Sequence, residues 1–124
     1  MNMKVWIIYG SFLSLLAVVL GAFGAHGLKN VLSQYSKEIY DTAIFYHFIH
    51  SLAIISIAIL NTQYDNINLS YSFYLFLFGI IIFSGSLYIL AITGIKWLGA
   101  ITPIGGMLFI FGWGYLIVTF YNHN

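Results

Sequence analysis

The sequence predicts an all-α integral membrane protein, a four-helix bundle with short loops, on three observations. Apolar side chains make up 61% of the 124 residues and Asp, Glu, Lys and Arg together only 6%, against roughly 25% charged residues in a soluble domain. The four basic and three acidic residues are separated by four long uncharged stretches. Each stretch is close to the roughly 20 residues that a helix needs to cross a bilayer core of about 30 Å. The stretches are also continuously apolar instead of alternating, which favours helices over a β-barrel.

The first predicted span covers residues 5–25 and begins directly after Lys4. A basic start, an apolar run and small residues at its end also fit a cleaved signal peptide. The apolar run of 21 residues is longer than the roughly 7–15 residues typical of the hydrophobic region of a signal peptide. We therefore expect this segment to be retained as a membrane helix, with cleavage as the alternative.

The other three predicted spans cover residues 43–60, 71–92 and 103–121. Gly94, just after the third span, is typical of a helix C-terminus. Thr102 followed by Pro103 predicts an N-cap and a first helical residue for the fourth span. We expect residues 1–124 to form a single transmembrane domain.

The distribution of lysine predicts the orientation. An even number of spans places both termini on the same side of the membrane. Lys29, Lys37 and Lys96 then lie in the first and third loops, against Lys4 alone beside the termini. Because the more basic side of a membrane protein tends to face the cytoplasm, we expect a cell-membrane protein with its termini outside, while dual or inverted insertion stays open.

Small residues mark the faces on which the helices are expected to pack, because membrane helices associate by close approach and by interhelical hydrogen bonds. The first span has small residues at steps of three or four, on one continuous face: Gly10, Ser14, Ala17, Gly21 and Ala25. The expected inner face of the second span carries Ala43, His47, His50, Ser51 and Ala58, with Ile54 as a bulky exception. The opposite face of this span carries Phe45, Phe48, Leu52, Ile55 and Ile59. In the fourth span, Gly105 and Gly112 are seven residues apart and nearly aligned.

Two short phrases are more specific than the composition. Residues 21–27 read Gly-Ala-Phe-Gly-Ala-His-Gly, and residues 102–106 read Thr-Pro-Ile-Gly-Gly. With His50 between them and Trp113 beyond, the chain resembles the small four-span membrane proteins of domain of unknown function 423, also called uncharacterised protein family 0382. The resemblance extends over nearly the whole chain and departs at Tyr46-His47, where the family usually has Tyr-Gln. It implies a four-span membrane fold and no particular substrate or reaction.

The topology places His26, His47, His50, Tyr88 and Thr102 toward the same end of the bundle. The first and third loops meet the end of the first span, the start of the second, the end of the third and the start of the fourth. We therefore expect any site there, as a shallow polar pocket about His50. Its candidate residues are His50, His26, Tyr46, Tyr88, Thr102 and Gly105. An ionisable residue within a span is a functional candidate, although a neutral His that hydrogen-bonds a neighbouring helix would explain it as well.

The sequence lacks the residue types on which many kinds of site depend. The chain contains no Cys and no Arg, and its predicted spans contain no Asp or Glu. A Ser-His-Asp triad or a carboxylate-containing metal site therefore cannot form within the spans, and we expect no catalytic residues, no metal and no cofactor. A net charge of +1 provides no basic patch, so nucleic acid is not an expected partner.

These observations predict a non-enzymatic, multi-pass membrane component, surrounded by the lipid bilayer. We expect it to pack as a homo-oligomer or with a larger membrane partner through its small-residue faces. The alternative is a small transporter or channel with His50 near its pathway.

Overall fold

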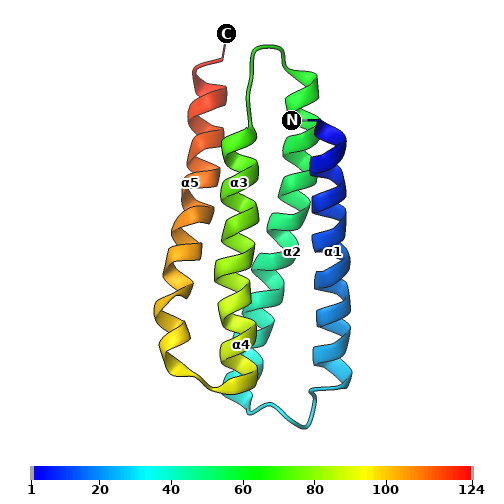
Figure 1. Ribbon diagram of the computed structural model, residues 1–124, viewed down its shortest axis with the longest axis vertical. Coiled ribbons are helices and arrows are strands. Elements are labelled where there is room, and N and C mark those ends of the chain that lie inside the picture. The colour runs from blue at the N-terminus through cyan, green and yellow to red at the C-terminus, as the bar shows by residue number, and fades with distance from the viewer. Residues whose placement is uncertain (1, 124) are drawn as a thin grey trace.

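The computed structural model describes residues 2–123, and every regular element in that part of the chain is helical (Figure 1). The first two spans are α1 (Met3–His26) and α2 (Gln34–Gln63). The third is continuous through α3 (Ser70–Gly79), the π-helical turn η1 (Ile80–Ser84) and α4 (Gly85–Thr93). The fourth combines the 3-10 turn η2 (Lys96–Ala100) with α5 (Thr102–Tyr121). All four segments are long and apolar enough to cross a membrane, which confirms the predicted all-α membrane fold.

The four spans lie side by side in the order α1, α2, third span and α5 (Figure 1). α1 packs along α2, α2 packs against the third span, and the third span packs against α5. The two outer spans are consequently the less buried ones. Of the most apolar stretch of each span, 17% is buried in the first and the fourth, against 44% in the second and 39% in the third. The protein therefore presents most of the surface of α1 and α5 to its surroundings.

Both ends of the chain lie at the same end of the bundle as the connection between α2 and α3 (Figure 1). The first and third loops lie together at the opposite end. This is the arrangement that an even number of antiparallel spans predicts. The polar residues near the first and third loops therefore do share one end of the molecule.

The local sequence predicts two helix termini, at Gly94 and at Thr102, and the structure confirms the first of them. Gly94 ends α4 in the left-handed conformation, with φ of 72°, and its N–H donates to the Leu90 carbonyl oxygen. The predicted N-cap at Thr102 is wrong, because the cap residue of α5 is Ile101 and no side chain caps this end. The Thr102 hydroxyl instead donates to the Leu98 carbonyl oxygen (3.2 Å) and bonds Ser86 (2.6 Å).

The helix α2 extends well beyond the predicted second span. It begins at Gln34, where the Ser33 hydroxyl accepts a hydrogen bond from the Ser36 N–H at 3.1 Å. The added turns carry Lys37, Glu38 and Asp41, all exposed. Charge spacing marks where a helix leaves hydrocarbon, but it does not mark where the helix itself begins.

Close approaches between helices occur at glycines. A Cβ atom at Gly10 of α1 would lie 2.6 Å from Ile55 Cγ1 and 3.0 Å from the Ser51 carbonyl oxygen of α2. A Cβ atom at Gly105 of α5 would lie 2.7 Å from the Cα of Phe83 in η1. At both places a backbone lies where a larger residue would place its side chain, so these two contacts fix the distances between neighbouring spans.

Candidate functional site

His50 lies at the centre of the bundle, and both of its ring nitrogens are hydrogen-bonded. Nδ1 donates to the Tyr46 carbonyl oxygen at 2.8 Å, and Nε2 accepts the indole N–H of Trp113 at 3.0 Å. Because a carbonyl oxygen only accepts and an indole N–H only donates, the ring must be neutral with its proton on Nδ1. The Trp113 bond joins α2 to α5. This arrangement matches a neutral His that stabilises helix packing by a hydrogen bond to a neighbouring helix.

Aromatic rings enclose the His50 side chain, which is 4% exposed. The Phe109 ring stacks on it at 3.6 Å between centroids, and Phe76 meets it edge-on at 5.3 Å. Two glycines make room for these rings. A Cβ atom at Gly79 would lie 2.5 Å from Phe109, and one at Gly112 would lie 2.5 Å from Phe76. His50 is therefore sealed among rings.

A second polar cluster, nearer the first and third loops, joins α1, α2 and α4. His47 Nδ1 and the Tyr88 hydroxyl lie 2.8 Å apart, and the Tyr88 ring meets the Tyr40 ring at 5.3 Å. The Tyr40 hydroxyl donates to the Leu20 carbonyl oxygen of α1. Gly24 is required for this contact, because a Cβ atom there would overlap the Tyr40 ring. His47 Nε2 is buried, and no residue within 2–123 makes a hydrogen bond of good geometry with it.

Three serines of the third span bind the neighbouring spans. The Ser72 hydroxyl donates to the Gly112 carbonyl oxygen at 3.0 Å, and the Ser84 hydroxyl donates to the Ala43 carbonyl oxygen at 2.8 Å. Ser86 bonds the Thr102 side chain. Together with the Tyr40, His47 and His50 bonds, each pair of adjacent spans is joined by at least one side-chain hydrogen bond. Such bonds contribute about 0.6 kcal/mol each on average within membranes, and up to about 1.7 kcal/mol.

The structure brings together only part of the pocket expected about His50. The Tyr46 ring lies parallel to His50 with centroids 6.1 Å apart. Tyr88 bonds His47 and Thr102 bonds Ser86, so neither lies against His50 as a wall. Gly105 packs on the backbone of Phe83. His26 is exposed at the end of α1.

The six residues expected at helix contacts differ in burial. Gly10, Ala17 and Gly112 are buried, and Ser14 and Gly21 are partly buried. Ala25 is exposed, because the contact between α1 and the start of α2 is made by Tyr40 against Gly24, one residue earlier. Three further contact residues were not predicted, namely Gly24, Gly79 and Ser72. Their only signal is a small residue within an apolar run, a signal that many other positions share.

The comparisons with known proteins agree with this architecture. A family model described as "Protein of unknown function (DUF423)" matches residues 20–106. The chain is 48% identical to the UPF0382 membrane protein SSP2132 of Staphylococcus saprophyticus, over 94% of this chain and 96% of that protein. It is 44% identical to the UPF0382 membrane protein YwdK of Bacillus subtilis, over 94% of this chain and 95% of that protein. No solved structure matches this one. The chain thus belongs to the DUF423 (UPF0382) family of membrane proteins.

Proposed function

We propose that the protein is a non-enzymatic component of the cell membrane whose intramembrane polar side chains serve to join its own helices. The observation that supports this most strongly is His50, whose two ring nitrogens bond Tyr46 and Trp113. Neither nitrogen is free to accept a proton or bind a ligand without breaking one of these bonds. The hydroxyls of Tyr40, Ser72 and Ser84 likewise donate to backbone carbonyls of neighbouring spans.

The outer helices suit packing against lipid, a second copy or a larger membrane partner. α1 presents large apolar side chains on the face away from α2, including Phe12, Leu15 and Val19. Association of such faces relies on close packing, because lipid and side chains are equally apolar. A small transporter or channel with His50 near its pathway is the competing function, and the enclosure of His50 by Phe109 and Phe76 argues against it.

A flux assay distinguishes these two functions. Purified protein is reconstituted into vesicles that contain a pH indicator and a potassium indicator, beside protein-free vesicles and vesicles with a known ionophore. We expect no proton or potassium flux above that of the protein-free vesicles. Flux that disappears in His50→Ala and persists in His26→Ala would overturn the proposal. His26→Ala is the control because this side chain is exposed at the last residue of α1.

We also propose that the termini lie outside and that the first and third loops lie in the cytoplasm. Lys29, Lys37 and Lys96 are exposed at that end of the bundle, and basic loops favour the cytoplasmic side. Because the chain contains no Cys, a single cysteine at Lys29 or at Asp65 reports the orientation by labelling with an impermeant maleimide on intact cells. Labelling at Asp65 alone is expected, and labelling at Lys29 alone would reverse the assignment.

A further inference from the structure

A polar cavity of about 530 Å³ lies at the end of the bundle that carries the termini. It is formed between the α2–α3 connection and the last turns of α5. The polar residues that line it are Asn66, Asn68, Tyr115, Thr119, Asn122 and His123. None of the residues lining it is Lys, Arg, Asp or Glu. Two of the lining amide and imidazole side chains already have partners: Asn68 Oδ1 accepts two hydrogen bonds from Ser70, and His123 Nε2 lies 3.1 Å from the Asp65 carbonyl oxygen. The cavity therefore offers a ligand chiefly the amides of Asn66 and Asn122 and the hydroxyl of Thr119, without formal carboxylate, ammonium or guanidinium charge.

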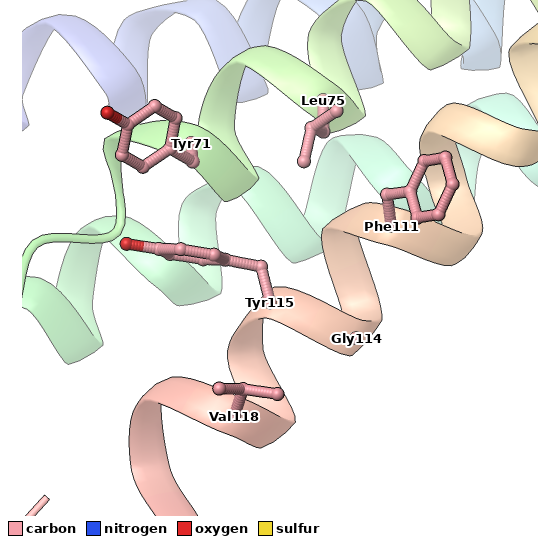
Figure 2. Close-up of a pocket in the computed structure, with 6 residues that line it drawn as sticks. All are labelled: Tyr71, Leu75, Phe111, Gly114, Tyr115 and Val118. Atoms are coloured by element: carbon pink, nitrogen blue, oxygen red, sulfur yellow. The ribbon is translucent and has the colours of Figure 1, made fainter. Parts of the chain in front are cut away.

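An apolar groove of about 540 Å³ adjoins this cavity between α3 and α5 (Figure 2). It is lined by Tyr71, Leu75, Phe111, Gly114, Tyr115 and Val118. The stretch of α5 from Phe111 to Val118 corresponds to about 10 Å along the helix axis. Because this groove lies on the outer side of two membrane-spanning helices, we expect it to be filled by lipid hydrocarbon chains.

Tyr115 belongs to both the cavity and the groove. Its hydroxyl donates to the Asn68 carbonyl oxygen at 3.0 Å, and its ring meets the Tyr71 ring edge-on at 5.4 Å. Figure 2 shows the hydroxyls of Tyr71 and Tyr115 at the same end of the groove, near the loop that leads into α3. The two rings thus mark a boundary between a polar compartment at the membrane surface and an apolar compartment below it.

We propose that the cavity and the groove together bind one membrane lipid with an uncharged, polyhydroxylated head group. One acyl chain occupies the groove over Gly114, and the head group occupies the cavity. Amide side chains both donate and accept hydrogen bonds, as a sugar hydroxyl does. A phosphate head group would instead be recognised by Arg or Lys, and the charged residue of the α2–α3 connection is the acidic Asp65.

Gly114 offers a direct test of the groove, because a Cβ atom there would have nothing within 4 Å. The Cβ atom of a leucine at this position therefore displaces no neighbour, and the rest of the side chain extends into the groove that Gly114 lines. Gly85 is a matched control, since a Cβ atom there also has nothing within 4 Å and the residue lies in the third span outside the groove. Both changes replace a helical glycine, so their effects on helix propensity are alike.

The experiment is native mass spectrometry of the delipidated protein in detergent, titrated with dioleoyl lipids that differ only in head group. The lipids are digalactosyldiacylglycerol, phosphatidylglycerol and phosphatidylcholine. We expect one digalactosyldiacylglycerol per chain, bound about tenfold more tightly than phosphatidylglycerol. Gly114→Leu should weaken this binding about tenfold, and Gly85→Leu should leave it unchanged.

A second pair of variants tests the cavity. Thr119→Val removes a hydroxyl from the cavity at nearly constant volume and should reduce the preference for the sugar head group. The control is Thr62→Val, an exposed residue near the end of α2 at the same end of the bundle, which should leave this preference unchanged. Equal binding of the three lipids, or unchanged binding in Gly114→Leu, would overturn the proposal. A dimer that Gly114→Leu dissociates, without any retained lipid, would assign the groove to a second copy instead. None of these outcomes bears on the proposed role of His50, which lies outside the groove and the cavity.

Discussion

Replacing Gly105 by alanine is expected to lower the free energy of unfolding by about 1–3 kcal/mol, the usual cost of overpacking a well-packed site. The new Cβ atom would lie 2.7 Å from the Cα of Phe83 and would overlap its backbone nitrogen. A backbone atom cannot rotate away as a side chain can. Phe83 is also fixed by its neighbour Ser84, whose hydroxyl bonds the Ala43 carbonyl oxygen of α2. Relief of the overlap would therefore require α5 to move away from the third span.

Gly106→Ala is the matched control for this prediction. It changes the adjacent residue of the same helix, and its Cβ atom would meet only the Phe83 ring, at an ordinary 3.7 Å. We expect this variant to be as stable as the wild type or more stable by up to about 1 kcal/mol, because alanine favours the helix over glycine. Unfolding of both variants in a detergent–denaturant titration supplies the comparison. Equal stability of the two would show that α5 and η1 do not approach as closely as described.

Replacing His50 by alanine is expected to cost about 3–5 kcal/mol, similar to the loss of a buried aromatic ring. The change empties the space against Phe109 and Phe76 and leaves the Trp113 indole N–H without its acceptor. We therefore expect any loss of function in His50→Ala to be accompanied by a loss of folding stability.

The loss of unfolding free energy in His50→Ala can be separated into a packing contribution and a hydrogen-bond contribution. Trp113→Phe keeps a ring and removes the donor. A double-mutant cycle between His50→Ala and Trp113→Phe should give a coupling energy within about 0.6–1.7 kcal/mol. His26→Ala is the control for loss of an imidazole, because that side chain is exposed. A His50→Ala protein as stable as His26→Ala would contradict the packing role.

The sequence predicts helix faces well where periodicity is strong. In α2, the expected inner-face residues Ala43, His47, His50, Ser51 and Ala58 are all buried. Of the five residues expected on the opposite face, Phe45, Leu52 and Ile59 are exposed. Phe48 and Ile55 are half-buried, and Ile55 packs against Gly10 of α1. The pattern of small and large residues therefore predicts the inner face of α2 correctly, but it does not show that α1 packs over part of the bulky face at Ile55.

Partners on other helices could not be predicted in the same way. His50 and Trp113 are 63 residues apart, and their contact depends on the relative rotation and depth of α2 and α5. Thr102 has the sequence pattern of a helix cap, but its hydroxyl instead bonds the hydroxyl of Ser86 in the adjacent span. The Tyr40 ring of α2 lies where a Cβ atom at Gly24 would be, although nothing in the local sequence of α1 indicates this contact. Periodicity determines which face is inside, and only packing determines what that face meets.

Polar side chains within the spans join neighbouring helices, and the protonation state of His50 provides the sharpest test of this role. We would record the ¹⁵N resonances of histidine in the detergent-solubilised protein at neutral pH, with His50→Ala to assign them. We expect a neutral ring with its proton on Nδ1, together with a Trp113 indole proton that exchanges slowly in D₂O and loses that protection in His50→Ala. A charged His50 ring, a proton on Nε2, or a rapidly exchanging Trp113 indole in the wild-type protein would contradict it.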